Sequence, residues 1–411
     1  MPTRRVVITG RGAVSPYGLG VELLIDKVWQ GCSGVRLMPD WQDIKGLKSY
    51  IAAPVPAVNS SEYLPRSLRR TMGDMAVYAV IASREAVEEA GLDKRTLTGG
   101  NTGVAIGSTT GSPGVYEEFY KNYIPKKSIE EVRSGMFFKI MGHSCAANVC
   151  LALGIRGEQW APASACTSAA QAIGLGYILI QSGRQEIMLC GGADETNPTV
   201  TMVFDVIKAA SRCTEEPLLA PRPFDSQRDG VVCGGGSGIL VLESLDSARK
   251  RGANILGEIR GFGLVNGSRH IANPDEETIA KAMNQAIAEA GISHNEIDYV
   301  NAHATGTILG DIAEGTAIRK NLGDDIPVSS FKGHLGHTLG AAGSLETIVV
   351  FEMLARQEIV PTLHLENLAP ELEGMDLVQG LRPCPMDYVL KTNFALGGVN
   401  TALLLKGTDK P

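Results

Sequence analysis

Short apolar runs alternate with longer segments of helical periodicity along the first part of the chain. Apolar runs of strand length occupy residues 5–10, 102–107, 186–193 and 237–243. Residues 74–90 instead place alanine and other apolar residues at helical spacing, and Gly91 follows as a stop signal. This alternation predicts an α/β fold in which helices cover a mixed, mainly parallel sheet.

A second round of the same elements begins after residue 250. Residues 255–263, 297–303 and 401–405 have the pattern of strands, and residues 276–290 and 341–355 have the pattern of helices. Because both rounds have the same order, we predict two similar halves, residues 1–250 and 251–411. The boundary falls in the charged run formed by Arg249, Lys250 and Arg251.

Composition narrows the classes of function. The 411 residues are 44% hydrophobic and include 48 glycines, which is enough for a sizeable core with many tight turns. A formal net charge of −7 argues against non-specific binding to nucleic acid, which requires a basic surface. An acidic partner would therefore have to meet a local basic patch.

The cysteines indicate a reducing compartment. Eight cysteines lie at irregular spacing without a Cys-x-x-Cys pair, and the apolar stretch at residues 6–8 is too short for a signal peptide. We therefore expect a cytoplasmic protein with free thiols.

One uncharged segment, residues 163–180, reaches the minimum length of a membrane span. It also contains Ser164, Thr167, Ser168, Gln171 and two glycines. We expect a buried helix here and no membrane span.

The candidate chemistry centres on Cys166. Small residues surround it, and an alanine-rich helix is expected to begin at or near it, which would favour thiolate over thiol. His303 and His337 come from distant points in the chain. One cysteine with two such histidines predicts acyl-thioester chemistry. The spacing of His, Cys and Asp residues fits no metal site, so no metal is expected.

Several motifs in order resemble the β-ketoacyl-acyl-carrier-protein synthases, the condensing enzymes of fatty-acid synthesis, of the synthase I or II type. They cover nearly the whole chain: residues 161–172 around Cys166, 223–225 with 228–230, 303–307 with Gly310, Asp311 and Glu314, 332–343, and 393–400. The resemblance implies a thiolase-like fold of five α-β-α-β-α layers and a dimer, either homodimeric or with a second synthase-like subunit. It implies no cofactor, because acyl carrier protein presents the substrates on its phosphopantetheine arm.

The resemblance also implies residue roles. Cys166 would carry the acyl group, and the backbone N–H groups of Cys166 and Leu396 would form the oxyanion hole. His303 and His337 would stabilise the enolate, ordered by an ion pair between Lys332 and Glu314, for which a plain buried salt bridge is the alternative. The substrate-binding set would be Thr305, Thr307, Thr110, Val231 and Asn400.

The chain departs from the family pattern in the gating turn, where Phe394 and Leu396 stand in a sequence that usually reads Phe-Gly-Phe-Gly-Gly. Val231 replaces the usual phenylalanine after an Arg-Asp-Gly motif, and Ala304 replaces a usual glycine. These changes keep open a specialised polyketide or polyene pathway, with a partner subunit.

Two further protein classes fit the residues less well. A non-catalytic partner subunit would lack Cys166, and a thiolase would need a second cysteine in residues 393–400, which contain none. The basic patch for an acidic carrier protein would comprise Arg66, Arg69, Arg70, Lys126 and Lys127, with ordinary solvated surface as the alternative.

Overall fold

The first half of the chain folds as a mixed sheet. The computed structural model describes residues 4–130, 132–267 and 270–408. The sheet order is β1-β8-β7-β5-β6, in which β5 lies parallel to β7 and β6 while the pairs nearer β1 are antiparallel. These strands are β1 (Val6–Ser15), β5 (Thr102–Gly107), β6 (Gln159–Trp160), β7 (Ile187–Asp194) and β8 (Gly236–Ser244).

The second half repeats this arrangement. Its order is β9-β15-β14-β10-β11, again with parallel pairs at the outer edge and antiparallel pairs toward the centre. The strands are β9 (Gly257–Asn266), β10 (Tyr299–Asn301), β11 (Val328–Ser329), β14 (Tyr388–Phe394) and β15 (Val399–Lys406). A short pairing of β1 with β9 joins the two halves edge to edge. The division at residue 250 itself stays a prediction.

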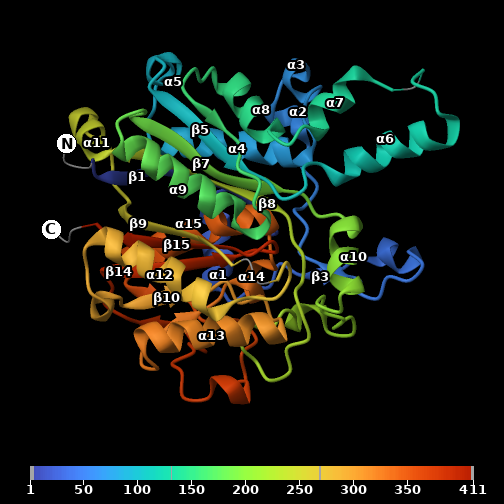
Figure 1. Ribbon diagram of the computed structural model, residues 1–411. Coiled ribbons are helices and arrows are strands. Elements are labelled where there is room, and N and C mark those ends of the chain that lie inside the picture. Colours follow the sequence, from blue (N-terminus) through green and yellow to red (C-terminus); the bar gives the residue numbers. More distant parts are fainter. Residues whose placement is uncertain (1–3, 131, 268–269, 409–411) are drawn as a thin grey trace.

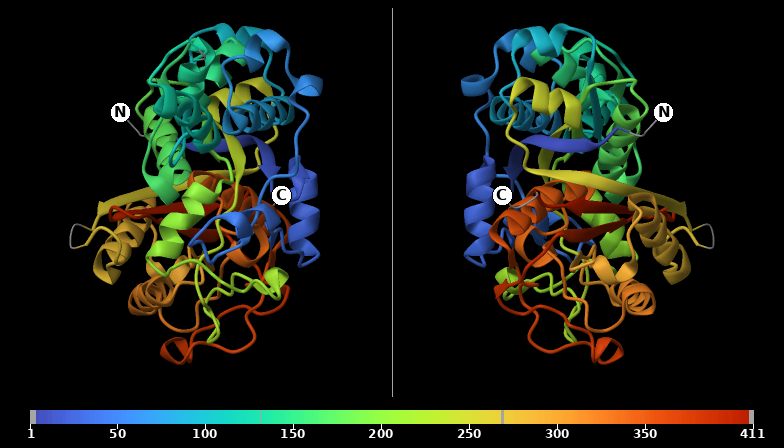
Figure 2. Two further views of the ribbon diagram at one scale, coloured as in Figure 1. Left: turned by 90° about the vertical axis from the view of Figure 1, so that its right-hand side faces the viewer. Right: turned by 90° about the vertical axis from the view of Figure 1, so that its left-hand side faces the viewer.

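Helices form three layers around the two halves of the sheet (Figures 1 and 2). α9 (Ser168–Gln181) and α15 (Ala342–Arg356) pack together in the middle layer. α4 (Asp74–Glu89) and α8 (Ser144–Leu153) cover the first half, and α12 (Glu276–Ala290) and α13 (Ile308–Leu322) cover the second. The predicted α/β fold and its five layers are confirmed.

Hydrophobic patterning explains which helices lie in the middle. α15 is buried on nearly every face, whereas α12 buries only the stripe that includes Ile279, Met283 and Ile287. A helix between two sheets has no solvent face, while an outer helix needs one apolar face only. The uncharged segment at residues 163–180 contributes most of buried α9, so the expected buried helix is confirmed.

Paired glycines bring the first strand of each half against its outer helix. A Cβ atom at Gly12 would lie 1.8 Å from the Ala82 carbonyl oxygen of α4. A Cβ atom at Gly263 would lie 1.9 Å from the Ala282 carbonyl oxygen of α12. Only glycine permits this approach, and the two halves use it at equivalent places.

The remaining elements connect these layers, and α6 (Pro113–Lys126) and α7 (Ser134–Ile140) extend from the body as an arm (Figure 1). Within the described residues no single helix is long and apolar enough to cross a membrane; α7 and α8 reach that length only together, bent by 105°. The other helices are α1 (Val21–Trp29), α2 (Ser60–Tyr63), α3 (Arg66–Arg69), α5 (Lys94–Thr98), α6 (Pro113–Lys126), α7 (Ser134–Ile140), α10 (Pro198–Val206), α11 (Leu245–Arg251) and α14 (Lys332–Leu335). The 3-10 turns are η1 (Pro39–Asp43), η2 (Ala165–Thr167), η3 (Pro217–Leu219), η4 (His294–Glu296), η5 (Leu339–Ala341) and η6 (Pro370–Leu372). The short strands are β2 (Gly18–Leu19), β3 (Arg36–Leu37), β4 (Ile51–Ala52), β12 (Glu358–Ile359) and β13 (Arg382–Pro383).

Candidate active site

A cavity of about 730 Å³ is lined by both halves of the chain. Cys166 comes from the turn before α9, and His303 follows β10. His337 follows α14, and Leu396 belongs to the turn between β14 and β15. The structure therefore brings together residues that lie up to 230 positions apart in the chain (166 to 396).

Cys166 lies in a sharp turn at the start of the middle layer. Ala165 before it has a left-handed φ of 48°, and η2 leads directly into α9 at Ser168. The predicted helix start at the cysteine is confirmed. The constrained backbone presents the thiol to the cavity while the side chain stays 6% exposed.

The protonation state of this thiol differs from the sequence prediction. Burial raises the pKa of Cys166 to about 12, although the nearby Lys332 ammonium acts in the opposite direction. The expected preference for thiolate is wrong, because loss of solvation outweighs the favourable helix start. The resting group is a thiol, so its attack on a substrate requires a base.

The two histidines lie beside the thiol. The Sγ atom of Cys166 and a ring nitrogen each of His303 and His337 all lie within 4.8 Å of one another. Burial, with the charge of Lys332, lowers the pKa of His303 far below its ordinary value and that of His337 to about 3. Both rings are therefore neutral at physiological pH. In the described part of the chain, neither ring nitrogen of His337 has a hydrogen-bond partner.

The same three donors are of the types that bind transition metals. Residue spacing in the sequence does not reveal this trio, because the fold alone brings its members together. The absence of a metal thus stays a prediction.

Lys332 contacts a different acid from the one predicted. Its ammonium pairs with Glu346 of α15, and Lys391 of β14 also binds Glu346, at 2.7 Å. Burial opposes the charge of Glu346, but the two ammonium groups together lower its pKa to about 2. The predicted ion pair between Lys332 and Glu314 is wrong: Glu346 belongs to the middle helix layer, and Glu314 belongs to α13 in the outer layer.

Glu314 instead supports the backbone of the histidine loop. Its carboxylate accepts the backbone N–H of His303 at 2.8 Å and of Ala304 at 2.7 Å, and the hydroxyl of Thr392 at 2.7 Å. Glu314 therefore orders His303, as expected, but through backbone hydrogen bonds.

Three residues that sequence reasoning did not single out complete this region. Glu346, Lys391 and Asn393 are buried behind the cavity and contact Lys332, His303 or each other. Glu346 and Lys391 are single charges within otherwise uncharged, mainly apolar runs, and such charges are costly to bury without a partner. That pattern could have identified both residues.

The threonines and Asn400 lie where the sequence predicts, along the cavity wall. The hydroxyl oxygens of Thr305 and Thr307 are 3.1 Å apart. Asp311 holds their loop by accepting the backbone N–H groups of Thr305 and Gly306. Asn400 donates to the Thr278 hydroxyl at 3.0 Å.

The cavity wall also includes Val231, Phe394 and Leu396, with the Phe394 ring centroid 5.7 Å from that of His303. Thr110 does not line the cavity, contrary to the prediction. It is exposed, because the chain beyond β5 is anchored by Thr109 to Asp194 and turns away at Gly111, whose φ is 80°.

The predicted docking residues lie outside the cavity lining. Arg66 and Arg69 belong to α3 and Arg70 follows it, while Lys126 ends α6 and Lys127 follows. Arg69 is partly buried and donates to the Leu64 carbonyl oxygen, and the other four are exposed. An exposed lysine that does line the cavity is Lys208, just after α10.

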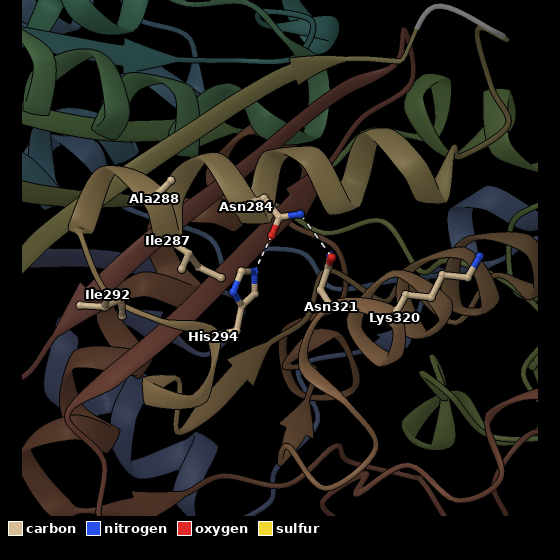
Figure 3. Close-up of a pocket in the computed structure, with 7 residues that line it drawn as sticks. All are labelled: Asn284, Ile287, Ala288, Ile292, His294, Lys320 and Asn321. Carbon is tan, nitrogen blue, oxygen red and sulfur yellow. Dashed lines mark hydrogen bonds between the residues drawn. The ribbon is translucent and has the colours of Figure 1, made fainter.

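A second, shallower pocket lies between α12 and α13 (Figure 3). Three of its polar side chains bind one another: His294 Nε2 lies 2.6 Å from Asn284 Oδ1, and the Asn284 amide donates to Asn321 at 3.2 Å. The fourth, Lys320, pairs with Glu276. All four polar groups therefore have partners in the protein, so this pocket suggests no separate chemistry.

Comparison with known proteins gives one consistent result. The family profile "Beta-ketoacyl synthase, N-terminal domain" matches residues 3–248, and "Beta-ketoacyl synthase, C-terminal domain" matches residues 256–366. The 3-oxoacyl-[acyl-carrier-protein] synthase 1 of Haemophilus influenzae is 34% identical over 406 residues, which cover 98% of this chain and 99% of that protein.

Two solved structures are similar over nearly the whole chain. A β-ketoacyl synthase from Burkholderia phymatum is 39% identical with a TM-score of 0.96, covering 99% of this chain and 100% of that one. The ishigamide ketosynthase/chain length factor is 30% identical with a TM-score of 0.92 and the same coverage.

Proposed function

Since the chain belongs to the β-ketoacyl synthase family, it is a condensing enzyme of the acyltransferase class, and we propose the following residue roles. The enzyme joins an acyl group held on Cys166 to the two-carbon unit of malonyl-acyl carrier protein. The products are 3-oxoacyl-acyl carrier protein, carbon dioxide and free carrier protein. The observation that carries this proposal is the meeting of three buried residues, Cys166, His303 and His337, in one cavity.

In the first step Cys166 becomes acylated. Neutral His337, whose ring nitrogens have no hydrogen-bond partner among the described residues, takes the proton of the thiol as sulfur attacks the acyl thioester. It then returns the proton to the departing carrier thiol. The backbone N–H groups of Cys166 and Leu396 bind the negative charge that develops on the carbonyl oxygen. A thiol with a raised pKa makes this proton transfer necessary.

In the second step the malonyl thioester loses carbon dioxide. The electrons of the broken carbon–carbon bond form an enolate, whose oxygen accepts hydrogen bonds from His303 and His337. The enolate carbon then attacks the acyl-enzyme and a carbon–carbon bond forms. The Cys166 sulfur leaves as a thiolate and takes up one proton from solvent, which the overall reaction consumes. Neutral imidazoles suit this role because they donate without adding a net charge.

Thr305 and Thr307 bind the amide groups of the phosphopantetheine arm along the cavity wall. Acyl carrier protein is the protein partner. None of these steps requires a metal or an organic cofactor, so we expect chelators to leave turnover unchanged. A cytoplasmic location is part of the same proposal.

A dimer fits the exposed apolar side chains at the edge of the first half. Trp160, on edge strand β6, is 39% exposed, and Phe137 of the arm is 64% exposed. Such apolar surface at a sheet edge suits a second synthase-like chain, either a copy or a related subunit.

The second candidate is a ketosynthase of a specialised polyketide or polyene lipid pathway that works with a partner subunit. It is favoured by the aliphatic walls at Val231 and Leu396, and by similarity to the ishigamide ketosynthase/chain length factor. Both candidates share the same chemistry at Cys166 and differ in the acyl chain accepted.

Mass spectrometry tests both. The enzyme is incubated with a panel of saturated and conjugated acyl-carrier proteins, and the mass added at Cys166 is measured before and after addition of malonyl-carrier protein. We expect an acyl adduct that disappears as 3-oxoacyl product forms. An adduct that persists, with no product, would contradict the condensation.

A further inference from the structure

Three consecutive residues of β14 support the histidine loop from two sides. Side chains alternate along a strand, so Lys391 and Asn393 share one face and Thr392 occupies the other. Lys391 and Asn393 contact Glu346 of the middle layer, whereas Thr392 contacts Glu314 of the outer layer. The two faces therefore act on His303 in different ways, one on its ring and the other on its backbone.

Asn393 is held in one orientation by two charged groups. Its Oδ1 atom accepts a hydrogen bond from the Lys391 ammonium at 3.0 Å, and its Nδ2 atom donates to the Glu346 carboxylate at 3.3 Å. An ammonium group only donates and a carboxylate only accepts, so a flipped amide would lose both bonds. The Lys391 ammonium and the Glu346 carboxylate thus fix which end of the Asn393 amide is the oxygen and which is the nitrogen.

The orientation of the Asn393 amide determines which hydrogen-bonding group faces the His303 ring. The same Nδ2 atom lies 3.2 Å from His303 Nδ1. An amide nitrogen donates and does not accept, so Nδ1 must be the acceptor and carries no proton. A neutral imidazole has a single ring proton, which then resides on Nε2, the nitrogen on the far side of the ring from Asn393.

We propose that Lys391 and Asn393 are positioning residues that fix His303 as its Nε2–H tautomer and so keep a hydrogen-bond donor directed into the cavity. The chemical use of that donor, binding of the enolate oxygen, rests on the function proposed above.

Burial makes this control effective. The side chains of Lys391 and Glu346 are 0% and 2% exposed, and Asn393 is fully buried, so water does not offer Nδ1 another partner. Burial lowers the pKa of Lys391 to about 8, opposed by Glu346, so the ammonium form predominates below that pH. Nearby charges on Lys332 and Lys391 also disfavour a second proton on His303.

The decisive experiment records the protonation of the His303 ring nitrogens by ¹⁵N NMR of the ligand-free full-length enzyme with ring-labelled histidine. His303 is assigned from the spectrum of a His303→Gln variant. We expect wild type to show an unprotonated Nδ1 and a protonated Nε2. Asn393→Asp, which presents an acceptor, should protonate Nδ1, and Lys391→Met should reduce the share of the Nε2–H tautomer.

Thr392→Val is the matched control, because it lies between the two residues and acts on the His303 backbone through Glu314. Its ring protonation should equal that of wild type, and thermal unfolding should establish that each variant folds. A protonated Nδ1 in wild type, an unprotonated Nδ1 in Asn393→Asp, or an unchanged spectrum for Lys391→Met would overturn the proposal.

Kinetics separate this proposal from the function on which it rests. In Asn393→Asp, acylation of Cys166 should persist while malonyl decarboxylation falls about 100-fold or more, the scale of a lost proton-transfer or donor group. The acid limb of its pH–rate profile should also move to higher pH. A wild-type enzyme with the expected tautomer and no condensation would contradict the proposed function alone.

Discussion

The imidazole rings of His303 and His337 lie edge to face, with their centroids 5.0 Å apart and their planes at 86°. Each ring can therefore direct a nitrogen to a shared point without stacking on the other. Two neutral donors converging on one position suit an oxyanion better than one, because the charge is divided between two hydrogen bonds.

The first prediction follows from this geometry. His303→Ala should retain acylation of Cys166, and His337→Ala should retain a measurable but slower acylation because it removes the base for the thiol. Both variants should lose condensation by orders of magnitude, since enolate stabilisation needs both donors. Each tenfold loss corresponds to about 1.4 kcal/mol of barrier. Release of labelled carbon dioxide from malonyl-carrier protein measures the second step alone, and wild-type rates in both variants would contradict the assignment.

The second prediction concerns the nucleophile. Cys166→Ala should abolish acylation and condensation, whereas Cys145→Ala and Cys150→Ala should retain turnover. Both control cysteines belong to α8 in the outer layer and lie outside the cavity lining. Peptide mapping of the acyl adduct identifies the modified residue. An adduct on another cysteine of the native enzyme would disprove the role of Cys166.

The third prediction concerns acyl specificity. Val231 and Leu396 place aliphatic side chains on the cavity wall, so rigid or unsaturated chains should be tolerated near the thioester. Val231→Phe and Leu396→Phe should shift preference toward saturated acyl-carrier substrates, because the aromatic rings occupy that space. Competition between saturated and conjugated substrates measures the shift, with Val231→Ile as a smaller control change. Identical profiles in all variants would show that these positions do not set specificity.

The fourth prediction concerns the carrier protein. Charge reversal at Arg66, Arg70 or Lys127 should raise the KM for acyl-carrier substrates and weaken its salt dependence, with little change in kcat. Lys250→Glu in α11 is a control of equal charge change. These residues lie outside the cavity lining, whereas Lys208 belongs to it. If only Lys208→Glu raises KM, the docking patch lies at the cavity instead.

The fifth prediction concerns stability in acid. Burial lowers the pKa of His334 to about 4, so between pH 6.5 and 4 the unfolded chain binds a proton there that the folded chain does not. Stability should therefore fall as pH decreases through this window, by up to about 1.4 kcal/mol per pH unit for each such histidine. His303 and His337 contribute in the same direction.

Urea unfolding at several pH values measures this dependence. His334→Gln should make the dependence of the unfolding free energy on pH shallower, because one fewer proton is taken up on unfolding. Replacing the exposed His143 by Gln should leave this dependence unchanged. Equal slopes in wild type and His334→Gln would contradict a neutral buried His334.

Local residue patterns were sufficient to predict the secondary-structure elements and the reacting groups. Strand and helix periods placed the strand β1, the buried helix α9 and the amphipathic helix α12, because burial on one face or all faces leaves a pattern in neighbouring residues. The small residues and turn around Cys166 likewise predicted a helix start. Motifs around His303 and His337 identified the chemistry before any distance was known.

The contacts between distant elements depended on tertiary packing and could not be predicted from local patterns. Lys332 pairs with Glu346 because α15 occupies the middle layer, and nothing in the spacing of residues 314, 332 and 346 reveals a layer. The pKa of Cys166 rises because packing excludes water, which outweighs the local helix start. Thr110 leaves the cavity because its chain turns away, and Lys391 and Asn393 reach Glu346 only where β14 faces α15. Local patterns record how each segment is buried, whereas ion pairs, protonation states and cavity walls depend on which segments meet.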